Sequence, residues 1–309
     1  MVPTRRVNVL GKIAADLESE IARRDAHGAA GCVGESRIAA GDGWSVTDVI
    51  CTSGPRDRAI EEQHAGVSIG VVVAGTFQYR SPNGRCLLTP GSLLLGNDGE
   101  CFECGHEHAT GDRCIAFRFA PAYFEQAVAD AGVKRGSRRF RVPQVPPVRA
   151  LSPLATRVAA GALQVLDVSW EETALEIAVV SVQLAASLPP MRSVMSADAG
   201  ARVTESIRRI EEEPSVAWSL ARLSADAGLS AFHYLRTFQE TAGVTPHQFI
   251  LRARLREAAL RLLVDDAKII DVALGAGFGD VSNFNKAFRL EYGVVPRAYR
   301  EGRRGARPG

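Results

Sequence analysis

The chain has 309 residues, of which 46% are hydrophobic and 23% are charged, and its formal net charge is +2. This composition excludes a disordered chain, which would have fewer apolar residues and more net charge, and the length suits two domains that each bury a core. No apolar stretch is long enough to span a membrane, and Met1 to Gly11 lacks the apolar segment of a secretory signal. We therefore expect a cytoplasmic protein with no membrane partner.

Short β-rich runs separated by Gly, Pro and Asn extend from about Val33 to Phe119. The pair Asn83-Gly84 lies between the apolar runs Val67 to Arg80 and Arg85 to Gly96, which predicts a hairpin. We expect this part of the chain to form an antiparallel β domain, as a small barrel or jelly roll.

A cluster of thiols and imidazoles lies in the segment CFECGHEHATGDRC near the end of the β-rich region. Ligands at C-x2-C-x-H-x-H spacing can converge on one ion, and soft ligands of this kind favour zinc or another thiophilic metal. His64 could join them from a neighbouring strand. Against this, alternate residues of a strand point to opposite faces, so the segment would have to turn, as Gly105 permits, and an unligated pocket wall is the competing interpretation. The candidate ligands are Cys101, Cys104, His106, His108 and Cys114.

Helical patterning begins at about Pro121 and, after a Pro-rich break at 142–147, continues to Leu188. In the last of these helices Leu175, Val179, Val182 and Ala186 have the spacing of one helical face. We expect that face to be covered by the β domain or by a second copy of the chain. Two prolines at 189–190 then end the helix, and small polar residues follow.

A first pair of short helices is predicted in the segment SLARLSADAGLSAFHYLRTF, which Ser219 begins as a helix cap. Gly228 supplies the backbone freedom for a tight turn, and Ser230 caps the second helix. In that helix Tyr234 and Phe238 form an i,i+4 pair that must face the core. The outward side of the helix then carries Phe232, His233, Leu235, Arg236 and Gln239.

The same pattern recurs about 50 residues later. A short helix begins at Ile269, a glycine-rich turn follows at 275–279, and Asp280 caps a helix whose buried pair is Phe284 and Phe288. The outward side of this second helix carries Val281, Ser282, Asn285, Lys286 and Arg289.

Two further features support an internal repeat. Each unit is followed by Gly-x-x-Pro, at 243–246 and at 293–296, and an amphipathic helix from Phe249 to Leu263 lies between the units. From Gly200 onward the chain carries 17 Lys and Arg against 13 Asp and Glu, a net charge of +4, which suits contact with phosphates. Two helix pairs that present polar outer helices are typical of recognition helices that enter a major groove.

These residues resemble the AraC/XylS family of bacterial transcription regulators over about residues 202–300. The resemblance is carried by S-x-x-x-L-x-R-x-F with G-x-x-P in the first unit, and by G-F-x-D-x-S-x-F-x-K-x-F with G-x-x-P in the second. Tyr234 stands where Leu is usual, and Lys286 where Arg is common, which weakens the case for bidentate guanine readout at that position.

The resemblance implies that both recognition helices insert into successive major-groove segments on one face of double-stranded DNA. The matching base-contacting positions are Phe232, Leu235, Arg236, Val281, Ser282, Asn285 and Lys286. It also implies a cupin-like N-terminal domain that binds a small-molecule or metal effector, a homodimer, and RNA polymerase as the partner of an activator. The sequence leaves open the effector, the operator, and whether the protein activates or represses.

We therefore predict an α+β chain, in which an N-terminal cupin-like β barrel with helices precedes an all-α domain of two helix-turn-helix units. Its segments are an effector-sensing domain at 1–147, a helical dimerisation segment at 148–190, a linker at 191–201, a DNA-binding domain at 202–301 and a disordered basic tail at 302–309. We expect no enzymatic activity. The competing hypotheses are a metal-dependent cupin enzyme, which leaves the repeated helix pairs unexplained, and a pure interaction module without salt-dependent DNA binding.

Overall fold

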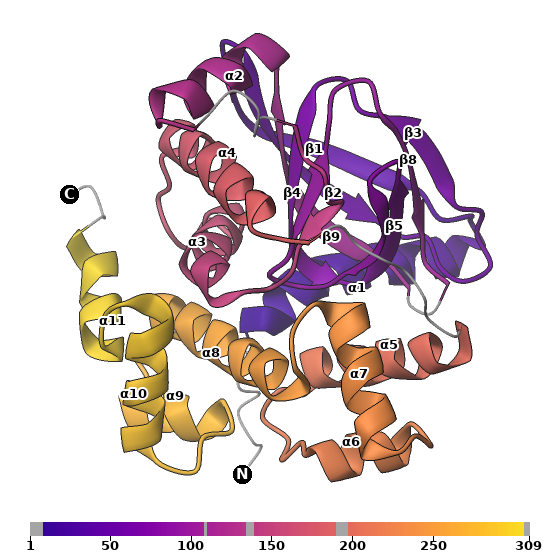
Figure 1. The fold of residues 1–309 in the computed structure, drawn as a ribbon. Helices are drawn as coiled ribbons and strands as arrows, with labels where there is room; N and C mark the ends of the chain where they lie inside the picture. The colour runs from indigo at the N-terminus through magenta and orange to yellow at the C-terminus, as the bar shows by residue number, and fades with distance from the viewer. Residues whose placement is uncertain (1–8, 108–109, 134–138, 190–196, 306–309) are drawn as a thin grey trace.

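The computed structural model describes residues 9–107, 110–133, 139–189 and 197–305. A β-rich part lies above a helical part in Figure 1, and a long helix, α1 (Val9–His27), lies between the two. The predicted α+β class, with a β domain followed by a helical domain, is confirmed. Among the described residues, no helix has the length and apolarity that a membrane crossing requires.

The β domain consists of two antiparallel sheets that face each other. The six-stranded sheet has the order β1-β2-β9-β4-β7-β10, and the four-stranded sheet has the order β3-β8-β5-β6. The strands are β1 (Val33–Gly41), β2 (Trp44–Cys51), β3 (Ile60–Gln63), β4 (Val67–Gly75), β5 (Phe77–Ser81), β6 (Gly84–Leu88), β7 (Leu93–Gly96), β8 (Cys101–Gly105), β9 (Asp112–Phe119) and β10 (Gln144–Val145).

The hairpin predicted at Asn83-Gly84 is present, because Ser81 pairs with Gly84 across the turn between β5 and β6. The run Val67 to Arg80 is divided, however. Gly75 adopts a φ of +72°, and the chain passes there from β4 in one sheet to β5 in the other. The residues on either side of this crossing contribute to an apolar core between the two sheets.

Helices of the N-terminal half pack on the outside of the six-stranded sheet. They are α2 (Pro121–Asp130), the 3-10 helix η2 (Arg149–Leu151), α3 (Ser152–Ala162) and α4 (Trp170–Ala186). The helix α4 packs against β1, β2 and β4, so the β domain itself covers its inner face.

The inner face of α4 differs from the predicted one. Of the four predicted positions only Val182 is buried, whereas Leu175 is 38% exposed, Ala186 is exposed and Val179 is half-buried. The buried positions are Thr173, Ala174, Ile177, Ala178, Ser181 and Val182. Small side chains at several of these positions let α4 approach the sheet closely, and for this reason they form the buried face of the helix instead of the larger Leu175.

The helical half contains α5 (Ala197–Glu212), α6 (Leu220–Asp226), α7 (Ala231–Ala242), α8 (Pro246–Val264), α9 (Ile269–Gly275), α10 (Val281–Tyr292) and α11 (Pro296–Gly305). Two details differ from the predicted segments. The helix α5 begins at Ala197, inside the predicted linker, and α11 continues to Gly305, inside the predicted tail. Residues 190–196 and 306–309 lie outside the described residues.

The two halves share buried contacts. Leu260 and Leu263 of α8 belong to the apolar core of the β domain, and Leu87 of β6 belongs to the core around α7. Polar contacts accompany them: Ser152 Oγ lies 2.5 Å from Glu291 Oε1, and the hydroxyls of Thr156 and Tyr292 lie 3.0 Å apart. The helical half is therefore docked on the β domain.

His64 is buried in the β domain, and this placement predicts a pH dependence of stability. Its ring stacks on Phe102 with centroids 4.1 Å apart, and its Nε2 lies 2.8 Å from the Tyr79 hydroxyl. Burial lowers the pKa of His64 to about 4, although the carboxylate of Glu100 opposes the shift. Protonation therefore favours the unfolded chain, and stability is lost as pH falls below about 6.5.

At pH 5 we expect this single group to lower the free energy of unfolding by about 2 kcal/mol relative to pH 7.5. Urea unfolding of the chain and of a His64→Gln variant at both pH values measures the difference. An equal loss of stability in both proteins would show that other groups cause the acid sensitivity.

Candidate functional site

The first helix pair, α6 and α7, is built by local signals. The Ser219 hydroxyl accepts a hydrogen bond from the Arg222 N–H at 3.2 Å, and the Ser230 hydroxyl accepts one from the His233 N–H at 3.3 Å. Between them Gly228 has a φ of +60°, a conformation that strains residues with a Cβ. Each helix therefore starts at a capped N-terminus, and the turn fixes the angle between them.

The second helix pair, α9 and α10, repeats the turn and the capped outer helix, whereas α9 starts after Lys268 without a side-chain cap. Asp280 Oδ1 accepts a hydrogen bond from the Asn283 N–H at 2.8 Å and so caps α10. In the turn Gly277 has a φ of +86°, and an added Cβ there would lie 2.7 Å from the carbonyl oxygen of Ser215. Gly243 ends α7 and Gly293 ends α10, both in the left-handed conformation.

The burial pattern of the two outer helices is the same. Tyr234, Phe238, Phe284 and Phe288 are all 0% exposed, as predicted for the two i,i+4 pairs. None of the ten predicted DNA-facing side chains is buried. Phe232, His233, Arg236, Gln239, Ser282, Lys286 and Arg289 are exposed, and Leu235, Val281 and Asn285 are half-buried.

The helix α8 joins the two units and is held firmly itself. Thr245 and Gln248 form a reciprocal capping box at its start, and the Arg254 guanidinium donates to the carbonyl oxygens of Pro214 and Val216 at 2.8 Å each. Figure 1 shows α8 running between the α6–α7 pair and the α9–α10 pair. The two outer faces are therefore held at a fixed separation.

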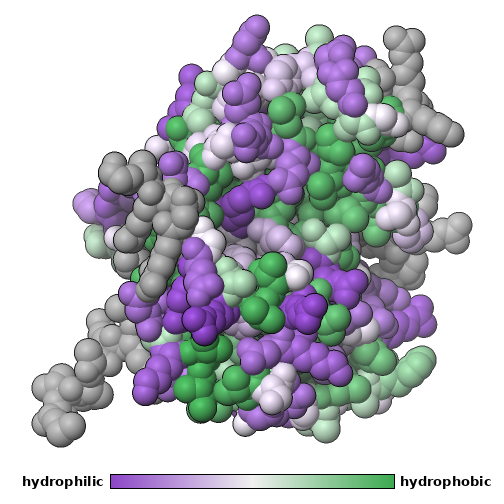
Figure 2. Space-filling view, turned by 90° about the vertical axis from the view of Figure 1, so that its left-hand side faces the viewer, coloured by the Kyte–Doolittle hydropathy of each residue, from purple (hydrophilic) through white to green (hydrophobic). Residues whose placement is uncertain are grey.

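The positive charge on the outer face of α7 is partly neutralised by a glutamate, whereas a further arginine adds to the positive charge beside α10. Arg236 is 69% exposed at its side chain and pairs with Glu240, with Nε 2.9 Å from Oε1. Beside α10, a groove is lined by Lys286, Arg289 and also Arg149 of η2. Arg149 was not among the predicted DNA-contacting residues, because it lies far from α10 in the sequence and comes close to it only where the two halves dock. Figure 2 shows hydrophilic side chains interspersed with hydrophobic ones over the lower, C-terminal half of the molecule.

The predicted cysteine and histidine cluster is only partly assembled. Cys101 and Cys104 lie on β8, whose pairing with β3 is continuous through both residues, so they point to opposite faces. Cys101 is exposed, whereas Cys104 packs against the apolar core between the two sheets, to which Cys114 belongs. His108 lies outside the described residues.

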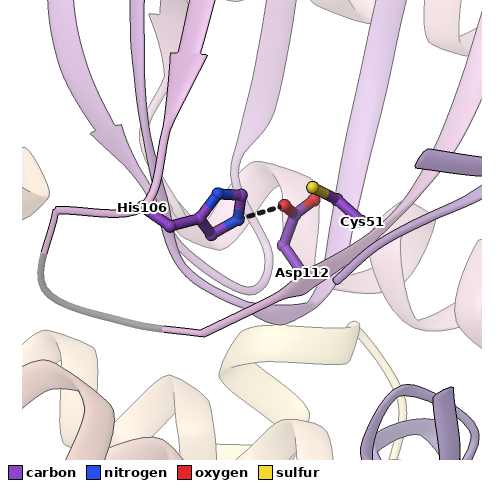
Figure 3. Close-up of side chains that lie close together, drawn as sticks. All are labelled: Cys51, His106 and Asp112. Atoms are coloured by element: carbon purple, nitrogen blue, oxygen red, sulfur yellow. Dashed lines mark hydrogen bonds and ion pairs between the residues drawn. The ribbon is translucent and has the colours of Figure 1, made fainter. Parts of the chain in front are cut away.

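His106 instead meets two residues that sequence analysis did not select. Its Nε2 lies 2.8 Å from Asp112 Oδ1, and Cys51 is close to both. Figure 3 shows the imidazole and the thiol on either side of the carboxylate. Cys51 and Asp112 are directly paired across β2 and β9, so their side chains share one face of the sheet. This pairing joins residues far apart in the chain, which ligand spacing does not reveal.

The three residues of this cluster are buried. The side chains of His106 and Asp112 are 1% and 7% exposed. Burial, followed by the negative charge of Asp112, raises the pKa of the Cys51 thiol to about 11. The Cys114 thiol lies 3.3 Å from Asp112 Oδ2, and burial raises its pKa as well. The carboxylate is therefore held at both oxygens.

Comparison with known proteins agrees with the two-part fold. Residues 48–166 match the model of an AraC-like ligand binding domain, and residues 223–302 match that of a helix-turn-helix domain. The chain thus joins a ligand-binding β domain to a paired helix-turn-helix domain. This confirms the resemblance to the AraC/XylS family.

Individual relatives match the C-terminal part. The HTH-type transcriptional regulator MtrA of Neisseria gonorrhoeae is 32% identical over 100 residues, which cover 32% of this chain and 33% of MtrA. The HTH-type transcriptional activator RhaS of Klebsiella pneumoniae is 30% identical over 105 residues, which cover 33% and 37%. The DNA-binding domain of AdpA, solved with a target DNA, is 27% identical, covers 35% of this chain and 96% of that one, and has a TM-score of 0.34. The matches span about a third of the length of these two curated relatives.

Proposed function

We propose that this protein is a sequence-specific DNA-binding transcription regulator, controlled by an effector that binds to the N-terminal β domain. One observation carries the proposal: two helix pairs are joined by one connecting helix and present outward faces. In each pair the turn contains a glycine with positive φ, the outer helix has a side-chain cap, and the buried aromatic residues occupy the same positions. Such faces, held at one separation, suit successive major-groove segments of one duplex.

Individual roles follow from side-chain chemistry. Arg236 and Asn285 are the best candidates for base edges, because each can make two hydrogen bonds to one base. Lys286, Arg289 and Arg149 suit phosphate contacts, which position a protein without reading sequence. The remaining contacts are assigned to Phe232, His233, Leu235, Gln239, Val281 and Ser282, of which Phe232 and Val281 suit thymine methyl groups.

The effector, the assembly and further partners belong to the same proposal. The N-terminal β domain takes a small molecule or a metal ion as its signal. Two chains pair as a homodimer, the bound protein contacts RNA polymerase, and the protein acts in the cytoplasm. MtrA and RhaS are named as transcriptional regulators, which supports a regulator rather than an enzyme.

Gel shift with the full chain and the promoter fragment beside its own gene tests the proposal. If six to ten phosphates are contacted, affinity should fall by about 10³- to 10⁵-fold between 50 and 200 mM salt. Arg236→Ala should weaken binding to the specific site by about 1–3 kcal/mol and relax the preference at one base pair.

Arg208→Ala is the matched control. Arg208 is also an exposed arginine that pairs with a glutamate four residues on, but it lies on α5, outside the two outer helices. This variant should keep the sequence preference. If binding does not respond to salt, the regulator proposal fails and the interaction module is favoured; if Arg236→Ala leaves sequence preference unchanged, only the base-reading role of Arg236 is rejected.

A further inference from the structure

The three side chains in Figure 3 lie at strand ends: Cys51 ends β2, Asp112 begins β9, and His106 directly follows β8. One potential ligand atom from each of Cys51, His106 and Asp112 lies within 4.8 Å of the other two. We propose that these three residues bind a divalent thiophilic metal ion of the zinc class. Binding at this site does not depend on the proposed DNA-binding function.

The geometry supports a shared ion. Zinc lies about 2.3 Å from a cysteine sulfur, 2.0–2.1 Å from a histidine nitrogen and 2.0–2.2 Å from a carboxylate oxygen, so a sulfur and an oxygen that bind one ion can be at most about 4.5 Å apart. His106 Nε2 and Asp112 Oδ1 are well inside that limit at 2.8 Å. The whole set lies within 4.8 Å, so the Cys51 side chain has to move by no more than a few tenths of an ångström to reach this range.

The donor set selects the class of metal. One sulfur, one imidazole nitrogen and one carboxylate oxygen form a mixed set that favours zinc-like ions, whereas magnesium and calcium prefer oxygen alone. Three protein ligands leave a fourth tetrahedral position for water or an effector atom. The Cys114 thiol contacts the other oxygen of Asp112 and so orients this ligand.

A second observation is independent of these distances. Among the described residues His106 Nδ1 is buried without a hydrogen-bond partner, and the side chain is only 1% exposed. Buried polar atoms without a partner are rare in native proteins. Within the described part of the chain, the polar contact of the imidazole is the one with Asp112, another of the three proposed ligands.

The site can also be reached. His106 lines a small surface pocket of about 80 Å³ together with Gln78, Arg85, Gly105 and Glu107. An ion entering this pocket therefore reaches the imidazole, which contacts the carboxylate of Asp112. Cys101 does not line this pocket, because it lies at the other end of β8, where it borders a second pocket with Glu61 and Pro82.

The test uses the purified full chain with Zn²⁺ and Co²⁺ as probes. We expect one Zn²⁺ per chain after desalting, measured by elemental analysis, and a near-ultraviolet thiolate-to-metal absorption band with Co²⁺. Cys51→Ala should abolish that band, and both Cys51→Ala and Asp112→Asn should weaken Zn²⁺ binding by more than about 100-fold. Circular dichroism establishes that the variants are folded.

Cys101→Ser and Cys32→Ser are the matched controls, since both thiols are exposed and outside the cluster. Both should retain stoichiometric Zn²⁺ and the Co²⁺ band. The proposal is overturned if the unmodified chain shows no Co²⁺ thiolate band, if Cys51→Ala binds Zn²⁺ normally, or if Cys101→Ser alone loses the metal. The Co²⁺ absorption band of the unmodified chain is measured without any variant. None of the three measurements depends on DNA binding.

Discussion

Replacing Phe238 by alanine is expected to lower the free energy of unfolding by about 3–5 kcal/mol. Phe238 is 0% exposed and packs edge-on against Phe249 of α8, with ring centroids 5.6 Å apart, and against Tyr234 at 5.9 Å. Removing the ring leaves a cavity in the core that holds α7 to α8, because the surrounding helices can collapse only partly. Urea unfolding followed by circular dichroism measures the loss.

Phe232 provides the control within the same helix. Its side chain is 78% exposed, so Phe232→Ala should change stability by no more than about 0.5 kcal/mol. The same variant should nevertheless bind the specific DNA site more weakly if the ring contacts a base methyl group. A large loss of stability in Phe232→Ala, or none in Phe238→Ala, would contradict the orientation of α7 described above.

The second large effect is expected at Arg256, which lies between the two halves. Its guanidinium pairs with Glu211 of α5 and donates to the carbonyl oxygen of Pro90 in the β domain at 3.1 Å. The side chains of Arg256 and Glu211 are 9% and 15% exposed. Arg256→Met should therefore destabilise the protein by about 3–5 kcal/mol, because it leaves a buried carboxylate without its cation.

A double variant separates the charge effect from packing. Arg256→Met combined with Glu211→Leu removes both charges and should recover most of the lost stability, since a buried ion pair is often replaceable by apolar residues. Chemical denaturation of the single and double variants gives the comparison. Equal destabilisation in both would mean that the contact with Pro90, rather than the unpaired charge, holds the halves together.

The helix-turn-helix units could be predicted closely because their signals are local. Ser219, Ser230 and Asp280 cap helices where expected, and each i,i+4 aromatic pair identifies its buried face without reference to the rest of the chain. The β-rich region largely kept its predicted limits, since β1 to β9 run from Val33 to Phe119, and the two-residue strand β10 at Gln144–Val145 lies beyond them.

Features that depend on distant packing were missed. The inner face of α4 depends on the sheet beneath it, and small residues such as Ala174 and Ala178 occupy it in place of Leu175. The cluster around His106 depends on the register of β2 and β9, which places Cys51 opposite Asp112. Ligand spacing along one segment cannot anticipate a partner from another strand. The DNA-contacting roles and the domain boundaries stay predictions.

Leu260 and Leu263 of α8 complete the core of the β domain while α8 also joins the two helix pairs. A fragment that contained only the helical half would expose both leucines to water. That half should consequently be less stable alone than in the intact chain, and heating the intact chain should give a single cooperative transition rather than two separate ones.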